Sequence, residues 1–278
     1  FRSTAKVGVF YYAYSDAFIA SVRDALSSVL DGAGIDYQNF DANNSQATQN
    51  ESITTALSSG TNLLLVNLVD TASVDAATTI IEQAEAAGAK VIFFNRAVEG
   101  DDQEGQVLNA YDSVAFVGTD APEAGHLQGQ MIGEYLTENF DTVDLNGDGK
   151  ISYAMMMGQV GNVEAIYRTQ YSVEDADAVL AEAGHGTADD PALVYFNPDN
   201  TDKYQADQAG NWSAQAALEY MQTNLSQYSE ANGNMIELVI CNNDNMAEGV
   251  ITALQAAGYN NGEDRKSTRL NSSHQKIS

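Results

Sequence analysis

Near its N-terminus the chain reads Val7-Gly8-Val9-Phe10-Tyr11-Tyr12, a short run of apolar and β-forming residues. Directly afterwards, residues 18–30 carry apolar side chains three and four positions apart, the pattern of an amphipathic helix. A buried strand followed at once by such a helix is the repeating unit of proteins built on parallel sheets. This stretch therefore predicts the α/β fold class.

The same alternation continues along the chain. Strands are expected at residues 35–40, 63–69, 91–95 and 114–117, with helices at 46–58, 73–87 and 122–140. It then begins again, with strands at 151–157, 193–196 and 236–241 and helices at 162–182, 212–226 and 245–257. We predict two doubly wound, Rossmann-like lobes, residues 1–118 and 119–263, with a ligand cleft between them. The second lobe is expected to be incomplete, because only three clear strands are found in it.

The last residues differ in composition from all that precede them. From Arg265 onward the chain holds four of its 12 Lys and Arg residues and none of its 39 Asp and Glu residues. One interpretation is a basic interaction arm, and the other is a foreign or artefactual tail that should be left out of fold reasoning. We favour the second for residues 264–278, which predicts a natural chain that continued and a C-terminal truncation here.

Charge and composition narrow the possible partners. The formal net charge of −27 argues against the phosphate-binding surface of a nucleic-acid binder. No apolar run reaches the roughly 18 to 20 residues that span a bilayer, and residues 1–5 do not resemble a signal peptide, so no signal sequence is expected in this chain. The only cysteine, Cys241, lies in an apolar run and is expected in the core, without an intrachain disulfide.

No pattern of residues indicates catalysis. The histidines His126, His185 and His274 show no metal-ligand spacing, and neither a Gly-x-Ser-x-Gly elbow nor a phosphate loop is found. A glycosidase would need two positioned carboxylates, and no such pair stands out among the acidic residues. We predict that the chain is not an enzyme.

A loop of regularly spaced oxygen ligands lies between the two sets of strands. It reads Asp144-Leu145-Asn146-Gly147-Asp148-Gly149-Lys150-Ile151-Ser152, with side-chain oxygens at positions 1, 3, 5 and 9 and the Lys150 carbonyl at position 7. This spacing is typical of an EF-hand calcium loop. Position 12 is Met155, so a carboxylate from elsewhere must complete the shell. The alternative is an Asx-rich turn without metal; we expect a structural Ca²⁺.

Several segments together resemble the galactose/glucose-binding proteins, periplasmic sugar-binding components of ABC importers with the type I periplasmic binding protein fold. The resemblance extends over residues 6–263. It rests on Tyr14-Ser15-Asp16-Ala17-Phe18, Val66-Asn67-Leu68-Val69-Asp70, Phe93-Phe94-Asn95, Val117-Gly118-Thr119-Asp120, the loop from Asp144 to Ser152, and Asn242-Asn243-Asp244.

The resemblance implies which side chains bind ligands. The family commonly has histidine and aspartate where Asn162 and Glu164 stand, so the hydroxyl pairing there is expected to be rearranged. A hexose suits the set, because carboxylates accept from its hydroxyls, arginine and amides donate to them, and flat rings cover its C–H faces. The sugar contacts look like Asp16, Phe18, Asn95, Asn162, Glu164, Arg168, Trp212 and Asn243, and the calcium ligands like Asp144, Asn146, Asp148, Lys150, Ser152 and Glu237.

The same resemblance implies partners and location. The chain would deliver D-galactose, D-glucose or both to a membrane ABC permease, with a chemoreceptor as a second partner. It would act as an extracytoplasmic monomer, free in the periplasm or lipid-anchored at the cell surface. The alternatives are a binding protein for a ribose- or xylose-like sugar and the sugar-sensing effector domain of a regulator. The calcium loop and Trp212 argue against the former, and the absence of a helix-turn-helix segment before Val7 argues against the latter.

Overall fold

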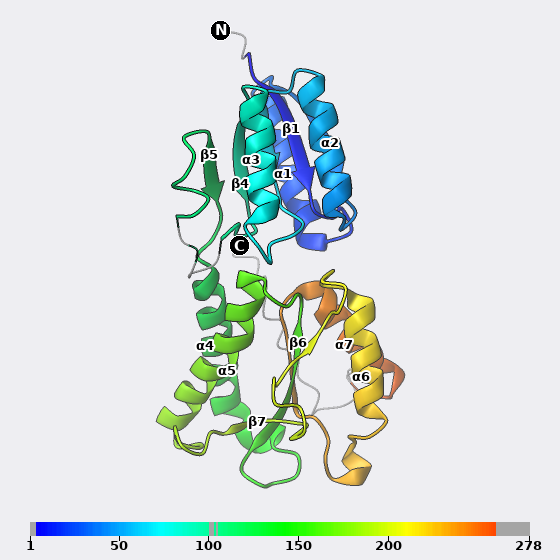
Figure 1. Ribbon diagram of the computed structural model, residues 1–278. Coiled ribbons are helices and arrows are strands. Elements are labelled where there is room, and N and C mark those ends of the chain that lie inside the picture. Colours follow the sequence, from blue (N-terminus) through cyan, green and yellow to red (C-terminus); the bar gives the residue numbers. More distant parts are fainter. Residues whose placement is uncertain (1–3, 100–102, 104, 260–278) are drawn as a thin grey trace. The chain divides into compact units, whose positions relative to one another are not determined.

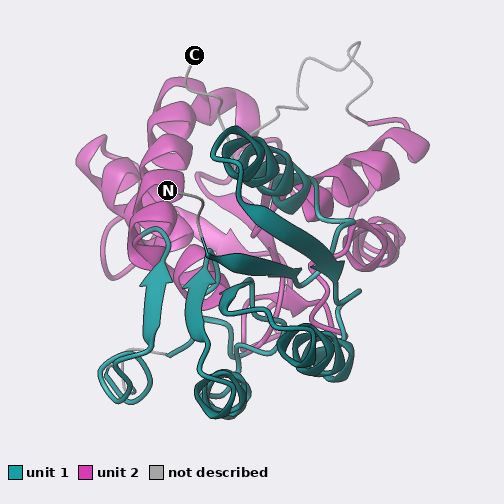
Figure 2. Ribbon diagram, turned by 90° about the horizontal axis from the view of Figure 1, so that it is seen from above, with its two compact units in different colours: residues 1–119, 161–163 teal, residues 120–160, 164–278 magenta. Residues whose placement is uncertain are grey.

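The computed structural model describes residues 4–99, 103 and 105–259 and divides the chain into two compact units. Unit 1 comprises residues 1–119 and 161–163, and unit 2 comprises residues 120–160 and 164–278 (Figure 2). The predicted boundary after residue 118 lies one residue away from this division, and the grouping of residues 161–163 with unit 1 was not predicted. The tail at residues 264–278 lies outside the described residues.

Unit 1 is built on a five-stranded parallel sheet (Figure 1). Its elements are β1 (Lys6–Tyr11), α1 (Ala17–Gly32), β2 (Asp36–Asp41), α2 (Gln46–Ser58), β3 (Leu63–Val66), α3 (Asp75–Ala86), β4 (Lys90–Phe94) and β5 (Val114–Val117). The strand order, β2-β1-β3-β4-β5, is that of a doubly wound sheet. The predicted α/β class with parallel sheets is therefore confirmed.

The interior strand β1 explains why helices cover both faces of this sheet. All of its residues except the first are buried, and successive side chains point to opposite faces. Val7, Val9 and Tyr11 pack with Ile19 of α1, whereas Phe10 packs in a second core with residues of α2 and α3. A strand that is apolar on both sides needs a helical layer on each.

Unit 2 repeats this pattern with a smaller parallel sheet (Figure 1). Its elements are α4 (Ala121–Val143), β6 (Ile151–Met157), α5 (Val163–Glu182), β7 (Leu193–Tyr195), β8 (Gln205–Ala206), α6 (Ala214–Leu225), the 3₁₀ helix η2 (Glu230–Asn232), β9 (Leu238–Cys241) and α7 (Asp244–Ala256). The central strand β6 pairs with β7, β8 and β9. Within the described residues, β9 pairs with no strand other than β6.

A stripe of glycines lets α4 pack closely on α5. A Cβ atom at Gly125 would lie 2.4 Å from the Tyr167 carbonyl oxygen, and one at Gly129 would lie 2.3 Å from the Tyr171 carbonyl oxygen. Gly133 continues the stripe one turn further along. Larger residues at these positions would push the two helices apart, so the glycine spacing sets the distance between α4 and α5.

Several elements differ from the sequence prediction, and three of the differences bear on the sheet edges or on the loop before α6. β3 ends at Val66 and not at residue 69, because the Asn67 side chain bonds to neighbouring strand ends. α6 begins at Ala214 and not at residue 212, because the Ser213 hydroxyl accepts from the Ala216 amide and caps the helix. The strand β8 was not predicted, since two residues are too few to carry a periodic pattern.

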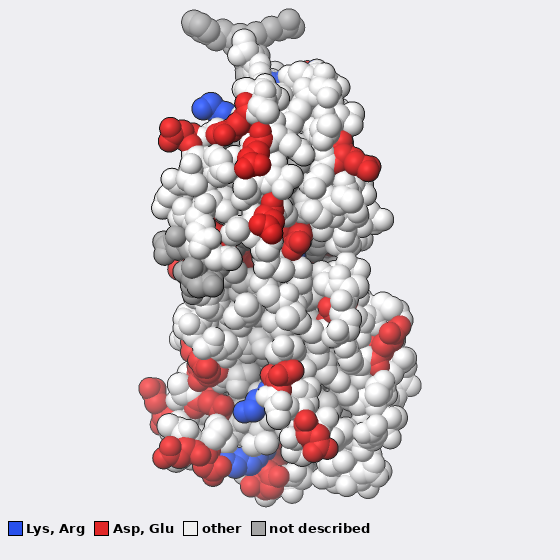
Figure 3. All heavy atoms as spheres, in the orientation of Figure 1, with Lys and Arg blue, Asp and Glu red and all other residues white. Residues whose placement is uncertain are grey.

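The surface is strongly acidic. Figure 3 shows Asp and Glu side chains scattered over the visible face, with few Lys and Arg side chains among them. This distribution fits the net charge of −27 and offers no basic patch on that face for a polyanion. None of the described helices combines the length and the apolar character needed to span a membrane.

Candidate functional site

In unit 1 one buried asparagine ties together the carboxyl ends of three strands. Asn67 directly follows β3, and its side-chain oxygen accepts a hydrogen bond from the Tyr12 amide, just after β1, at 3.3 Å. Its side-chain nitrogen donates to the Asn95 side-chain oxygen, just after β4, at 3.1 Å. We call this arrangement the asparagine clasp. It fixes the edge of the sheet at which ligands bind in open α/β folds.

Asp16, the first predicted sugar contact, is held by a hydrogen bond to each carboxylate oxygen. One oxygen accepts from the Ile19 amide at 2.9 Å and caps α1. The other accepts from the Tyr12 hydroxyl. Burial of Tyr12, and secondly the charge of Asp16, raise the pKa of Tyr12 above its usual range, so the phenol keeps its proton. Asp16 is thus a fixed hydrogen-bond acceptor.

The Tyr12 ring is braced by Arg96, which follows β4. The guanidinium carbon of Arg96 lies 4.4 Å from the centroid of the Tyr12 ring, a cation–π distance. The same guanidinium donates to the Leu68 and Val69 carbonyl oxygens at 2.9 and 2.8 Å. Arg96 therefore connects the loop after β3 to the aromatic ring after β1.

The other two predicted contacts of unit 1 lie at the same edge of the sheet. Asn95 follows β4 with a φ of +67°, in the left-handed region. Because its side-chain oxygen accepts from Asn67, its side-chain nitrogen is the end that can donate to a ligand. Phe18 lies in the first turn of α1 and is 36% exposed, an unusual position for a large apolar side chain.

Unit 2 contains an equivalent asparagine clasp. Asn242 directly follows β9, and its side-chain oxygen accepts from the Gly158 amide, just after β6, at 3.0 Å. Its side-chain nitrogen donates to the Thr169 hydroxyl of α5 at 3.1 Å. Like Asn67, Asn242 is fully buried. By this comparison, Gly158 in unit 2 occupies the position that Tyr12 occupies in unit 1.

Trp212, the predicted stacking residue, packs against Gly158. A Cβ atom at position 158 would lie 2.1 Å from the indole ring, so only glycine leaves room for it. The guanidinium carbon of Arg168 lies 5.8 Å from the Trp212 ring centroid, and its NH1 donates to the Asn242 carbonyl oxygen at 2.9 Å. Trp212 has a φ of +54°, which costs a bulky residue roughly 1–3 kcal/mol. The prediction that Trp212 begins a helix was wrong, because it precedes the capping residue of α6.

Two further predicted contacts lie near this tryptophan or on α5. The Asn243 side-chain oxygen accepts from the Met246 amide at 3.0 Å and caps α7, while its nitrogen donates to the Trp212 carbonyl oxygen at 3.2 Å. Glu164 lies in the first turn of α5 and is 8% exposed. Asn243 therefore joins α7 to the loop before α6 that carries Trp212.

Asn162 is not where the sequence placed it. It was expected in the second lobe, but residues 161–163 group with unit 1. Gly161 turns the chain with a φ of +81°, and the Asn162 side-chain nitrogen donates to the Thr71 hydroxyl, in the loop after β3, at 2.6 Å. Asn162 therefore contacts the loop after β3, within the unit to which residues 161–163 are assigned.

The loop at residues 144–152 is folded by its own side chains. Asp144 accepts from the Gly147 amide at 2.8 Å with one carboxylate oxygen and from the Gly149 amide at 2.9 Å with the other. Asn146 and Asp148 each accept from the amide two residues further on, both at 2.9 Å. These are Asx turns, which curl the backbone around the oxygens.

Glu237 reaches this loop from the residue before β9. One of its carboxylate oxygens accepts from the Leu145 amide and the other from the Ser152 amide, both at 2.7 Å. Burial raises the pKa of Glu237, and these hydrogen bonds act in the opposite direction. The structure thus brings Glu237 beside a loop that lies far from it in the sequence.

The predicted calcium ligands fit a hard cation in kind, since all of them offer oxygen atoms. In the part of the chain that the structure describes, however, no three His, Cys, Asp or Glu side chains gather as a metal-binding group. The carboxylates of Asp144 and Glu237 accept from backbone amides, and the Lys150 side chain donates to Asp190 at 2.6 Å. The ligand set is Asp144, Asn146, Asp148, Lys150 through its carbonyl, Ser152 and Glu237.

Sequence reasoning did not single out the residues that support these contacts. The Gln49 side chain donates to the Asn67 carbonyl oxygen at 2.9 Å. Asp207 accepts from the Ala209 and Ser213 amides at 2.9 and 3.0 Å and shapes the loop that carries Trp212. For the two clasp residues a signal existed, because each is the first polar residue after a buried apolar strand.

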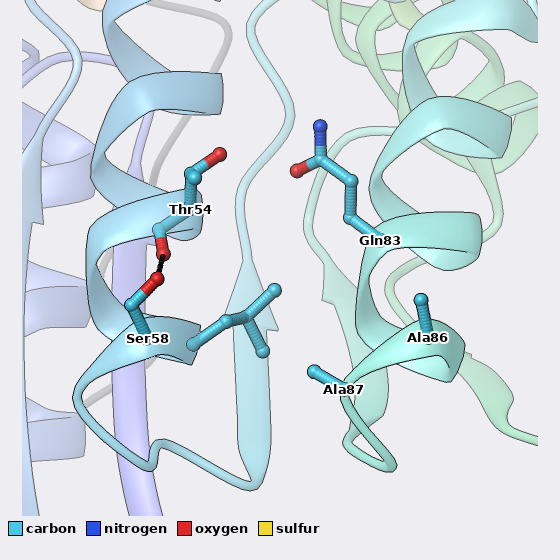
Figure 4. Close-up of a pocket in the computed structure, with 6 residues that line it drawn as sticks. Thr54, Ser58, Gln83, Ala86 and Ala87 are labelled. Carbon is cyan, nitrogen blue, oxygen red and sulfur yellow. Dashed lines mark hydrogen bonds between the residues drawn. The ribbon is translucent and has the colours of Figure 1, made fainter.

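A separate hollow lies on the surface of unit 1 between α2 and α3 (Figure 4). None of the predicted sugar or metal ligands lines it, and no charged side chain does. It therefore differs from the sheet edges, which carry charged carboxylate and guanidinium groups. Its lining residues are Thr54, Leu57, Ser58, Gln83, Ala86 and Ala87.

Each of the two units has a parallel sheet with polar residues at the carboxyl ends of its strands, the arrangement of α/β proteins that bind ligands there. Residues 7–265 match the model of the periplasmic binding protein domain family, and the chain belongs to that family. Its members bind substrates for transport and are not enzymes, and membership implies an extracytoplasmic location.

Particular relatives narrow the comparison. The chain is 32% identical to the D-galactose/methyl-galactoside binding periplasmic protein of Haemophilus influenzae over 261 residues, 93% of this chain and 69% of the relative. It resembles the structure of an ABC transporter solute binding protein from Clostridium phytofermentans with bound β-D-glucose, with a TM-score of 0.68, 24% identity and coverage of 90% of this chain and 68% of that one. It also resembles the structure of an ABC transporter solute binding protein from Bacillus halodurans with bound myo-inositol, with a TM-score of 0.64, 23% identity and coverage of 92% of this chain and 72% of that one. These two structures support the type I periplasmic binding protein fold.

Proposed function

We propose that the chain binds a hexose, D-galactose, D-glucose or both, as the sugar-binding component of an ABC importer. One observation carries this proposal. In each unit, an arginine-braced aromatic ring lies beside hydrogen-bonding side chains at the carboxyl end of the sheet. Such an edge offers the polar groups that a sugar requires, and the Phe18 and Trp212 rings would supply the flat surfaces.

The chemistry of the side chains suits a ring that carries hydroxyl groups. Asp16 is a fixed acceptor and Asn95 a donor, and Arg168 adds a planar guanidinium. Phe18 and Trp212 would cover the C–H faces of the ring. Glu164 and Asn243 would complete the hydroxyl contacts, together with Asn162 if its bond to Thr71 is exchanged for one to the ligand.

The relatives support the same class of ligand. One is named for galactose and methyl-galactoside, and the two structures hold glucose and myo-inositol. All of these are six-membered rings or sugars with several hydroxyl groups. A hexose is therefore the ligand to test first, and a ribose- or xylose-like sugar is the alternative.

We further propose that the loop at residues 144–152 and Glu237 bind a structural Ca²⁺. The chemistry of the donor set supports this, because it consists of oxygens and includes three carboxylates. When bound, the ion would neutralise these carboxylates and fix the loop. The residues of this chain supply the frame: Glu237 joins both ends of the loop through the Leu145 and Ser152 amides.

The family supports an ABC transporter component in the membrane as partner and an extracytoplasmic location. The proposed partner is a membrane ABC permease, with a chemoreceptor as a second, and the protein is proposed to act as a monomer. Its proposed location is the periplasm, either free or lipid-anchored at the cell surface.

Calorimetric titration with galactose, glucose, ribose and xylose tests the proposal. We expect heat with at least one hexose and little with the pentoses. Phe18→Ala should weaken hexose binding, whereas Val29→Ala, which removes another exposed apolar side chain of α1, should not. Binding of pentoses alone would favour the alternative sugar, and no heat with any of the four would contradict sugar binding.

A further inference from the structure

Resting on the proposed function, we propose that Tyr12 and Arg96 are positioning residues that hold Asp16 as an acceptor for a sugar hydroxyl. Neither residue was among the predicted sugar contacts. Both belong to unit 1, as does Asp16, so the inference depends on the geometry of that unit alone.

The chain of contacts begins at Arg96. This arginine is 6% exposed, and its NH1 donates to the Leu68 and Val69 carbonyl oxygens. Its guanidinium carbon lies 4.4 Å from the Tyr12 ring centroid. Because the carbonyls are part of the loop after β3, they hold the cation at a set place over the ring.

Tyr12 transmits this position to Asp16. Its amide donates to Asn67, which fixes the backbone, and Arg96 fixes the ring. Its hydroxyl then donates to one carboxylate oxygen of Asp16, while the Ile19 amide donates to the other. With one donor on each oxygen, the carboxylate cannot rotate without losing a bond, and each oxygen keeps capacity for a further donor.

The Tyr12 hydroxyl is the donor in this contact. Burial raises the pKa of Tyr12, so the phenol keeps its proton and Asp16 is the acceptor. A carboxylate only accepts hydrogen bonds. Asp16 would therefore select a ligand group that donates at this point, such as a sugar hydroxyl.

The adjacent residue supplies a matched control. Tyr11 is also buried, but its hydroxyl has no hydrogen-bond partner in the described structure. Tyr11→Phe and Tyr12→Phe remove the same atom from neighbouring buried rings. Only Tyr12→Phe removes a bond to Asp16 and leaves the stacking with Arg96 in place.

The test measures affinity for galactose and for a series of monodeoxygalactoses by calorimetry, with folding verified by circular dichroism. Tyr12→Phe should weaken galactose binding by roughly tenfold, since it removes a bond to a charged group. The same substitution should reduce affinity much less for the deoxy sugar that lacks the hydroxyl bound by Asp16. Tyr11→Phe should leave both affinities unchanged. Arg96→Met should weaken galactose binding, and Arg96→Lys should restore part of the loss.

The outcomes separate this inference from the proposed function. If the wild-type protein binds no hexose, the proposed function fails and the inference falls with it. If the wild type binds hexose and Tyr12→Phe binds as tightly as Tyr11→Phe, only the inference is overturned. An equal loss with galactose and every deoxy sugar would also overturn it, because that result indicates general damage to the unit.

Discussion

The two units build the same arrangement from different residues. In unit 1 the residue after β1, Tyr12, itself supplies the aromatic ring. In unit 2 the equivalent residue is Gly158, and the ring comes from Trp212, on a loop before α6. In unit 2 the absence of a side chain at Gly158 leaves room for the Trp212 ring. Both units thus have an aromatic ring at the carboxyl end of the sheet, but the ring comes from different positions in the sequence.

The supports of the two rings are alike. Each ring lies near an arginine that donates to a backbone carbonyl. Arg96 donates to a carbonyl in the loop after β3, and Arg168 donates to the carbonyl of the residue after β9. Each strand end is held by an asparagine clasp. The difference is in strain, because Trp212 has a left-handed backbone and depends on a glycine neighbour. The ring of unit 2 should therefore be the more sensitive of the two rings to substitution of its neighbours.

The largest expected effect is that of Gly158→Ala. The added Cβ would clash with the indole ring, so Trp212 must move. We expect hexose affinity to fall by roughly 100-fold, the upper end of the usual cost of overpacking, as measured by calorimetry. Gly32→Ala in α1, where a Cβ meets nothing within 4 Å, is the control and should leave binding intact. Normal binding by Gly158→Ala would remove the proposed difference between the units.

Calcium should stabilise unit 2 alone. At a concentration 100 times its Kd, a cation that binds only the folded state adds about 2.7 kcal/mol. Cys241 reports on this unit, since its thiol is buried and burial raises its pKa to about 12. We expect calcium to slow the reaction of Cys241 with a thiol reagent and a chelator to reverse the effect, with no response in Asp144→Ala. Equal labelling rates with calcium and with chelator would reject the calcium proposal.

The clasps compare the units directly. Asn67→Ala and Asn242→Ala each leave buried groups without a partner, which costs about 1–3 kcal/mol. Asn67→Ala should lower the free energy of unfolding more than Asn242→Ala does, because Asn67 joins three strand ends, whereas Asn242 joins two strands and a helix. Urea unfolding, followed by Trp212 fluorescence for unit 2 and by circular dichroism for the whole chain, measures both. A larger loss for Asn242 would reverse the order of the clasps.

The smallest expected effect is a pH dependence within unit 2. Asp177 accepts from the Leu193 amide at 2.8 Å, and burial raises its pKa. A carboxyl whose folded pKa is raised stabilises the fold below its unfolded pKa and loses that contribution as the pH rises through the folded pKa. In Asp177→Asn, the free energy of unfolding should fall less between about pH 4 and 6 than in the wild type. Parallel curves for the two proteins would show that Asp177 contributes nothing.

The sequence predicted most of the fold because strands buried on both sides and amphipathic helices have distinct periodicities. It also predicted that Glu237 lies with the loop at residues 144–152, through resemblance to a family and not through spacing. It could not predict that Asn162 groups with unit 1 and bonds to Thr71, because a contact between residues 91 positions apart leaves no periodic pattern in the sequence. Nor could it predict the conformation of Trp212, which follows from the capping of α6 and the absence of a side chain at Gly158.

The asparagine clasps also bear on how internal repeats are recognised. Methods that compare residues position by position would find Tyr12 opposite Gly158 and score a mismatch. A comparison of hydrogen-bonding roles would instead pair Asn67 with Asn242. Each directly follows a strand, and each accepts from the backbone amide of the first residue after the neighbouring strand, β1 or β6. One polar residue in each half is then enough to align two halves whose aromatic residues no longer correspond.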